Sequence, residues 1–525
     1  MIKRIVHLWY RLFNDNNEKK FIKHNIEVFS PLKINSEKKI LVEFTPLQHC
    51  VLSWSYFTNI LASQKNASIY TYGPVEKIPS LSLMKIYKSF NVQGYISEKI
   101  SKEEYKEVYK DAINIYHTLN NKKQLQQLKY KKYGIGQDVY ETYLINGHPT
   151  VDLNDQKLFN FLLQAMIKVH YWDRYFDTND VSAVIVSHDC YLGNIIRRVA
   201  NKYNVDVYQL TTSWGVKLFE GYNSGTNFKY YHKLYEQLPP QKQNSLKEWA
   251  KKQLARRFSG EVGVDMSYSH KSSFGSILDT KVIKKTNNIK ILICTHCFFD
   301  NPYAYGTNIL FTDFYEWLVF LGEMSNKTEY DWYLKCHPDY RPGTKETLQK
   351  IISMYPKIKM IPETVSHQQL IEEGIRYVFT VYGTVGCEYP LLGAQVINAG
   401  NNPHIAYDFN WHPRTIKEYE NIILNLPNIE KKINPEDVYE FYGIHHQYAM
   451  YASKNRAKDD LLFYSEQDMR RKLGKLVYTS KMYKYFLDEF NDNRHQDIIN
   501  NFKQLLRRMN EYHDDILVKE WQEDD

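Results

Sequence analysis

The chain has 525 residues, of which 43% are hydrophobic and 24% charged, as in a globular protein with two or three domains. Its 68 lysine and arginine residues outnumber 60 acidic residues, and the net charge of +8 favours anionic partners. Basic residues are mixed with acidic ones throughout the chain and no nucleic-acid-binding motif is present, so we expect no nucleic-acid partner. No stretch approaches the ~20 apolar residues that a membrane-spanning helix requires.

The N-terminal residues 1–14 combine three basic residues with a short, interrupted apolar run. This pattern does not indicate a signal peptide, so we expect a cytoplasmic protein. An amphipathic segment of this kind either packs on its own domain or lies on the inner face of the cytoplasmic membrane. The six cysteines are expected to be reduced, and a metal site is not expected, because no second pair follows Cys294 and Cys297 at zinc-site spacing.

The first β/α unit begins with an apolar run at residues 39–44. A helical stripe follows, and residues 69–72 are the next predicted strand. This Rossmann-like opening lacks a Gly-x-Gly-x-x-Gly fingerprint, so no dinucleotide cofactor is indicated. Ligands gather at the carboxyl ends of such strands, which directs Glu43 and His49 toward a cleft.

A second pair of strands is predicted at residues 183–187 and 205–210, separated by a helix with an apolar stripe. His188 and Asp189 follow the first of these strands directly. A neighbouring His-Asp pair is as often structural as functional. Since neighbours in an extended chain point to opposite faces, only one of the two can face a substrate.

The domain division follows from a change in composition. Residues 245–258 form a basic amphipathic helix, a second candidate for membrane attachment. The polar stretch that follows has no sustained periodicity. We therefore predict an N-terminal Rossmann-like domain at 1–262, a linker at 263–288, a C-terminal Rossmann-like domain at 289–434 and a helical extension at 435–525.

The most informative stretch spans residues 333–400, where short apolar strands alternate with helical patterns. Its last helix begins directly after Gly383 and Thr384. Gly383 permits close approach of a ligand, Thr384 can cap the helix, and the first-turn N–H groups favour an anion. Glu388, one turn further, is placed to accept hydrogen bonds from sugar hydroxyls.

Cationic and aromatic groups precede this helix. His337 ends a strand and is followed by Pro338, which fixes the turn, while Lys335 lies on the same face two residues earlier. His296 follows the strand predicted at 290–294. Such groups neutralise a departing phosphate without a metal. Each has a structural interpretation by itself, but their joint position at strand ends favours an active site.

Four segments in this order carry a family resemblance. The chain reads Thr-His-Cys-Phe-Phe-Asp at 295–300, Phe-Tyr-Glu-Trp-Leu at 314–318, Leu-Lys-Cys-His-Pro at 334–338 and Tyr-Gly-Thr-Val-Gly-Cys-Glu at 382–388. It resembles bacterial capsule and surface-carbohydrate biosynthesis proteins, a group that includes the Kdo and sialyl transferases of the GT-B class. The resemblance covers residues 290–400 well and the first domain only through its β/α pattern.

The resemblance implies an α/β protein with the GT-B fold: two Rossmann-like domains facing a cleft, here with a helical C-terminal segment. It also implies a nucleotide-sugar donor and no required metal or other cofactor. The His-Pro element is similar to the one that those enzymes use against a nucleotide phosphate. Tyr382-Gly383-Thr384 stands where they carry a paired Ser/Thr element, which argues against a CMP-sugar donor. The expected donor-binding residues are His337, Lys335, Gly383, Thr384, Glu388 and His296.

We therefore expect a glycosyltransferase that extends a capsule or other surface glycan, with a glycan or lipid-linked glycan as acceptor. The alternatives are a polyol-phosphate transferase of the CDP-glycerol type and a non-catalytic sugar- or nucleotide-binding subunit. Among strand-end groups, Asp300 would lie too near the departing phosphate to act as base, and Glu43 is expected to meet a structural partner. Asp189 is the favoured catalytic base, followed by His188 and then His49.

Overall fold

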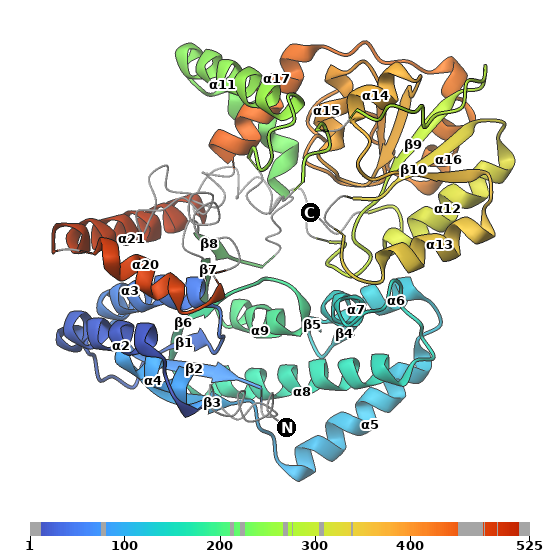
Figure 1. Cartoon of the computed structure of the whole chain (residues 1–525). Helices are drawn as coiled ribbons and strands as arrows, with labels where there is room; N and C mark the ends of the chain where they lie inside the picture. Colours follow the sequence, from blue (N-terminus) through green and yellow to red (C-terminus); the bar gives the residue numbers. More distant parts are fainter. Residues whose placement is uncertain are drawn as a thin grey trace.

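The structure, a computed structural model, describes residues 12–74, 80–210, 215–220, 226–265, 271–275, 277–303, 309–337, 340–449, 476, 478–490 and 492–513. It contains two β-sheets with helices on both faces, and these form two domains that face each other (Figure 1). The α/β class with two Rossmann-like domains, as in the GT-B fold, is confirmed.

The first sheet has the strand order β3-β2-β1-β6-β7-β8, and every neighbouring pair is parallel except β7 and β8. The strand order reverses between β1 and β6, so the carboxyl ends of these two strands mark the switch point where such sheets bind ligands. The strands are β1 (Lys39–Glu43), β2 (Ser68–Gly73), β3 (Val92–Ser97), β6 (Val181–Val186), β7 (Asp206–Leu210) and β8 (Gly215–Leu218).

Both faces of the first sheet are apolar. Consecutive side chains of a strand point in opposite directions, and the apolar residues of these strands are divided between two cores. Leu41 and Val184 face one core, which is covered by α5 (Lys102–Thr118), α7 (Gly136–Ile145), α8 (Gln156–Thr178) and α9 (Ile195–Lys202). Ile40 and Val42 face the other, which is covered by α2 (Asn16–Phe29), α3 (Gln48–Lys65), α4 (Leu81–Ser89), α20 (Lys481–Glu489) and α21 (Asp492–His513).

The second sheet is entirely parallel, with the strand order β11-β10-β9-β12-β13 and its switch point between β9 and β12. Its strands are β9 (Lys290–Cys294), β10 (Asp331–Lys335), β11 (Ile358–Ile361), β12 (Tyr377–Thr380) and β13 (Gln395–Asn398). One face is covered by α12 (Phe314–Lys327), α13 (Thr344–Met354) and α16 (Ile416–Leu424), and the other by α14 (His367–Glu372) and α15 (Val385–Leu391).

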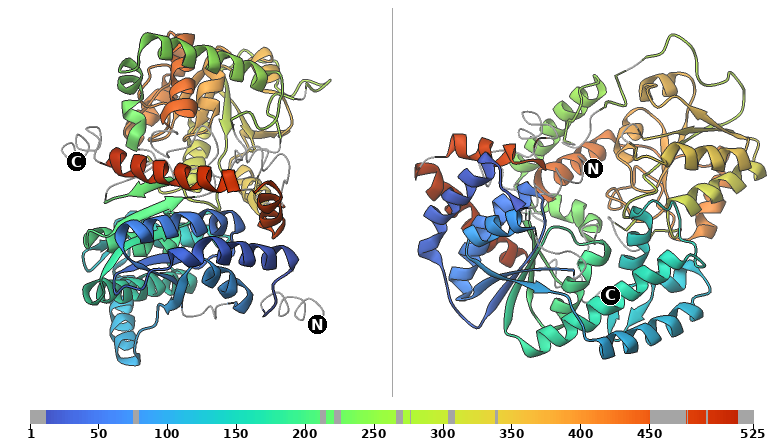
Figure 2. Two further views of the ribbon diagram at one scale, coloured as in Figure 1. Left: turned by 90° about the vertical axis from the view of Figure 1, so that its left-hand side faces the viewer. Right: turned by 60° about the horizontal axis from the view of Figure 1, so that its bottom comes forward.

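The side-chain contacts divide the chain differently from the sequence-based domains. Helix α11 (Pro240–Phe258) buries Leu246 and Leu254 against Phe441 of α17 (Pro435–Gly443), so residues placed in the first domain pack on the second. Helices α20 and α21 return to the first domain, where α21 lies along α3, and Figure 2 shows these two red helices beside the blue ones. The boundary at residue 262 and the single extension at 435–525 therefore do not follow these contacts.

The expected membrane attachment through residues 245–258 is not supported. The apolar side chains of α11 are turned into the second domain. Three of its cations form ion pairs: Lys247 and Lys251 with Glu436, and Arg256 with Glu261. The N-terminal amphipathic segment lies outside the described residues, except for 12–14. Within the described ranges, no helix is long and apolar enough to span a bilayer.

Candidate functional site

A cavity of about 180 Å³ lies at the switch point of the second sheet. The carboxyl ends of β9, β10 and β12 line it together with the start of α15 and the end of α11. All six residues expected to bind the donor line this cavity: His296, Lys335, His337, Gly383, Thr384 and Glu388. The structure thus brings together residues that are nearly one hundred positions apart in the chain, although their individual contacts differ from the expectation.

Lys335 is the last residue of β10, and only 3% of it is exposed. Within the part of the chain that the structure describes, its Nζ has no hydrogen-bond partner. Burial lowers the pKa of Lys335 to about 8, although Cys294 and Glu388 act in the opposite direction. A buried ammonium without a partner is costly, so this group indicates a site for an anion.

The carboxylate of Glu388 has a partner within the protein. It is 1% exposed, and its Oε1 accepts a hydrogen bond from Nε of Arg257 at 2.5 Å. Arg257 stands in the last turn of α11 and also lines the cavity. This ion pair holds a second cation beside Lys335, and the expected contact of Glu388 with sugar hydroxyls stays a prediction.

The turn at Gly383 is occupied by internal hydrogen bonds. Its N–H donates to Thr380 Oγ1 at 3.1 Å, and a Cβ at this position would lie 2.8 Å from the same oxygen. Thr384 stands at the N-cap position of α15 without a side-chain cap hydrogen bond, and the helix has only seven residues. The side-chain cap expected from Thr384 is thus not formed, the N–H of Gly383 is engaged within the protein, and glycine is required at 383 by the close approach of Thr380.

His296 holds the backbone of the neighbouring strand end. Its Nε2 lies 3.1 Å from the N–H of Val381, so this nitrogen accepts and Nδ1 carries the proton. The imidazole stacks on the ring of Phe314, with the two ring centroids 4.7 Å apart. Burial, with His337 as a second cause, lowers the pKa of His296 to about 3. It is a neutral positioning group rather than a cation for phosphate.

His337 and His367 complete the polar lining of the cavity. His337 follows β10 and is exposed. His367 is 3% exposed, and its Nδ1 has no hydrogen-bond partner among the described residues. The sequence analysis missed both His367 and Arg257, because nothing in the local pattern of α14 or α11 relates these helices to the strands of the second sheet.

The switch point of the first sheet carries a hydrogen-bonded chain of three side chains. Oε2 of Glu43 accepts from the backbone N–H and from the hydroxyl of Ser187, each at 2.7 Å. Ser187 Oγ lies 2.8 Å from Nδ1 of His188. Because the hydroxyl proton of Ser187 goes to Glu43, Nδ1 of His188 must donate to Ser187. In a neutral ring this leaves Nε2 as an acceptor, on a side chain that is exposed.

The other two base candidates, Asp189 and His49, lie in different surroundings. Asp189 is half-buried and follows His188. His49 stands in the first turn of α3, where its ring packs edge-on against the ring of Tyr478, with the two ring centroids 5.5 Å apart. The structural partner expected for Glu43 is confirmed, since its carboxylate binds Ser187.

A contact between the domains joins the two switch points. The hydroxyl of Tyr191 donates to Oδ1 of Asp300 at 2.7 Å, and Arg341 pairs with the same carboxylate at 3.3 Å. Tyr191 has a φ of 58°, a conformation that costs an L-residue free energy, and its N–H donates to buried Glu141. The loop after β6 is thereby held against the loop after β9.

No protein family and no curated protein sequence matches the chain. Solved structures similar to it include the beta Kdo 2,4 transferase KpsC of Thermosulfurimonas dismutans, at 11% identity and a TM-score of 0.31, over 50% of this chain and 79% of that one. A UDP-GlcNAc 2-epimerase from Neisseria meningitidis, bound to UDP-GlcNAc, matches at 10% identity and a TM-score of 0.24, over 79% and 99%. The UDP-GlcNAc 2-epimerase of Methanocaldococcus jannaschii matches at 12% identity and a TM-score of 0.17, over 84% of this chain and 99% of that one. Similarities this low do not assign an activity to the chain.

Proposed function

We propose that this protein is a glycosyltransferase that moves a sugar from a nucleotide-activated donor to a growing capsule or other cell-surface glycan. The observation that carries the proposal is the buried ammonium of Lys335, which has no hydrogen-bond partner among the described residues and lies in a cavity at the switch point of the second sheet. The phosphate of a nucleotide sugar supplies the anion that this group lacks.

In this proposal, Lys335 and Arg257 neutralise the charge that develops on the departing nucleotide, with His337 at the exposed side of the cavity. His296 takes no part in the chemistry and keeps the 380–382 backbone in place.

The acceptor is activated from the first domain. We place His188 ahead of Asp189 as base, because Ser187 and Glu43 orient its ring with Nε2 as acceptor. Nε2 takes the proton of the acceptor hydroxyl, the hydroxyl oxygen bonds to the anomeric carbon, and the bond from that carbon to the nucleotide phosphate breaks. The products are the extended glycan and a nucleoside phosphate.

The test is a thermal-shift screen of nucleotide sugars, followed by turnover assays with the donors that bind. A ligand at 100 times its Kd stabilises the folded protein by ~2.7 kcal/mol. Release of a nucleoside diphosphate with sugar transfer supports the proposal. Transfer of a polyol phosphate with release of a monophosphate supports the CDP-glycerol-type alternative, and donor binding without any turnover supports a binding subunit. A protein that binds no nucleotide sugar contradicts the proposal.

A further inference from the structure

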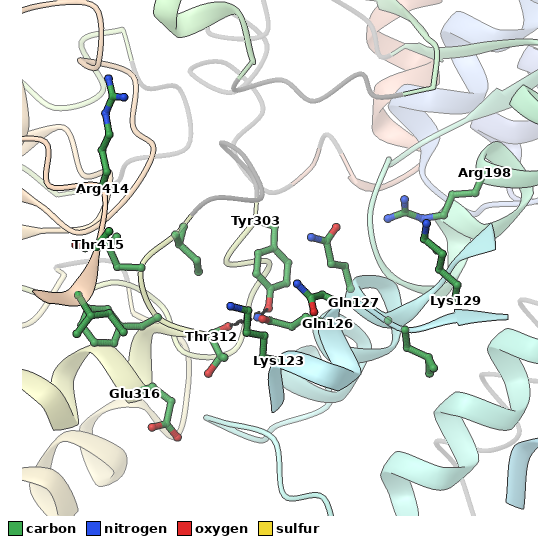
Figure 3. A pocket seen from close by; sticks show the side chains of 18 residues that line it. Lys123, Gln126, Gln127, Lys129, Arg198, Tyr303, Thr312, Glu316, Arg414 and Thr415 are labelled. Atoms are coloured by element: carbon green, nitrogen blue, oxygen red, sulfur yellow. Dashed lines mark hydrogen bonds between the residues drawn. The ribbon is translucent and has the colours of Figure 1, made fainter. Parts of the chain in front are cut away.

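A second and larger cavity, of about 890 Å³, lies between the two domains. From the first domain it is lined by residues of α6 (Lys122–Gln126), β5 (Tyr133–Gly134) and α7, and from the second by residues 309–312 and 414–416. Figure 3 shows side chains of both domains converging on it. Ligand cavities usually measure 300–1,000 Å³, so this volume suits a ligand larger than a single sugar.

The walls of this cavity are fixed by direct contacts between the domains. Oδ2 of Asp313 accepts from the hydroxyls of Tyr140 and Thr150 at 2.5 and 2.6 Å. Asp313 is 1% exposed, and it also caps the start of α12. Lys122 pairs with Glu316 beside it. These buried hydrogen bonds hold the two domains together beside the cavity, so its walls have fixed positions relative to each other.

The charge of the lining is positive. Lys123, Lys129 and Arg414 form no ion pair among the described residues, and Figure 3 shows them spread across the cavity, with Lys123 between the other two. The other charged side chains are compensated: Glu316 by Lys122, and Arg198 by Asp138. A ligand that crosses the cavity therefore meets three uncompensated cations.

The remaining lining suits a carbohydrate. Amide and hydroxyl groups come from Gln126, Gln127, Gln137, Thr312 and Thr415, and apolar surface comes from Ile309 and Phe311. Polar groups of this kind bind sugar hydroxyls, and the apolar side chains offer contact to the C–H faces of the rings.

A short segment connects this cavity with the donor cavity. Tyr303 lines the large cavity, and its N–H donates to Oδ1 of Asn301. The carbonyl oxygen of Asn301 accepts from the hydroxyl of Tyr382, which lines the donor cavity. Asn301 thus contacts one lining residue of each cavity, so the two cavities are neighbours in the structure.

We propose that the interdomain cavity binds the acceptor and that this acceptor is an anionic oligosaccharide, charged through either carboxylated sugars or phosphodiester links. This inference rests on the proposed function and adds the acceptor class to it. Because the three cations are exposed, each contact contributes modestly and binding weakens with salt.

The test measures binding of three probes to the full chain without donor: an oligogalacturonate, a glycerol-phosphate oligomer and a neutral maltooligosaccharide of similar length. The variant Lys123→Ala/Lys129→Ala/Arg414→Ala is compared with Lys106→Ala/Lys110→Ala/Lys281→Ala, which removes three exposed charges outside the cavity. We expect one or both anionic probes to bind, and the cavity variant to lose about tenfold in affinity while the control variant does not. The preferred anionic probe identifies the source of the charge.

Equal binding of the neutral probe, unchanged binding by the cavity variant, or tighter binding of a single-stranded oligonucleotide overturns the inference. Thermal shift with nucleotide sugars separates it from the proposed function. If the cavity variant still binds donor and shows only a raised KM for the acceptor, the proposed function and the acceptor assignment are both supported. If no nucleotide sugar binds but anionic oligosaccharides bind through the three cations, the proposed function fails and the cavity assignment stands.

Discussion

The carboxylate of Glu43 accepts both the backbone N–H and the hydroxyl of Ser187, although the two residues are 144 positions apart. They meet because β1 and β6 are neighbours in the first sheet, with Val42 in register with Ile185. The contact orients His188 at the switch point, opposite the domain that carries Lys335. The following predictions concern these two groups and the residues around them.

The first prediction concerns the base. His188→Ala should lower turnover by about 10²–10⁴ while donor affinity is preserved, because proton removal fails but the phosphate site is intact. Asp189→Asn should have a smaller effect. Steady-state kinetics with donor titrations measure both quantities. The opposite ranking would make Asp189 the base, and near-normal turnover in both variants would direct the search to His49.

The second prediction concerns the positioning of His188. Ser187→Ala and Glu43→Gln should each lower kcat by up to about 10², since the ring loses the hydrogen bond that fixes its orientation, while KM for the donor stays unchanged. Ser187→Thr retains a hydroxyl and should recover most of the activity. If threonine is no better than alanine, the hydroxyl has no role in orienting the imidazole.

The third prediction concerns Lys335. Lys335→Met should abolish donor binding yet raise the free energy of unfolding at pH 7 by about 2–3 kcal/mol, because a buried charge is removed. The pKa of Lys335 is lowered from 10.5 to about 8 in the folded protein. The unfolded chain therefore binds more protons between these values, and the wild type gains stability as the pH rises from 8 to 10.5.

Denaturant unfolding of the wild type and of Lys335→Met at pH 7 and pH 10 tests whether the stability of the wild type rises with pH. The stability difference between variant and wild type should narrow at the higher pH, since only the wild type carries the titrating ammonium. A variant that is less stable than the wild type at pH 7 would show that Lys335 has a partner in the unliganded protein.

The fourth prediction concerns His337, which lines the cavity from its exposed side. His337→Ala should weaken nucleotide binding by roughly 1.5–3 kcal/mol, the contribution of one charge-assisted hydrogen bond, and should leave the melting temperature unchanged. Calorimetric titration with the best donor measures the loss. Normal donor affinity in this variant would assign His337 a role outside the donor site.

The fifth prediction concerns the ion pair of Arg257 and Glu388. Arg257→Met leaves a buried carboxylate unpaired and should destabilise the protein by roughly 3–5 kcal/mol. The double variant Arg257→Met/Glu388→Leu should recover most of that loss, because both charges are gone. Chemical unfolding of the single and double variants completes the cycle. Additive losses would mean that the two side chains do not depend on each other for stability.

Local pattern alone predicted most of the strands and helices that carry the site. The apolar runs at 39–44 and 290–294 became β1 and β9 within one residue at each end. The hydrophobic pattern of a strand depends only on which of its faces are buried, and both faces of these sheets are buried. The strand-end positions of Lys335, His337 and His188 followed for the same reason.

What each of these residues contacts was decided by the tertiary structure. The strand order that sets β1 beside β6 and β9 beside β12 joined Glu43 to Ser187 and His296 to the 381 backbone. The return of α11 to the second domain placed Arg257 on Glu388, from 131 positions away. The same packing buried the ammonium of Lys335, which meets no hydrogen-bond partner within the described ranges. Hydrophobic periodicity determines which face of an element is buried, but partners distant in the chain are fixed only when whole elements pack.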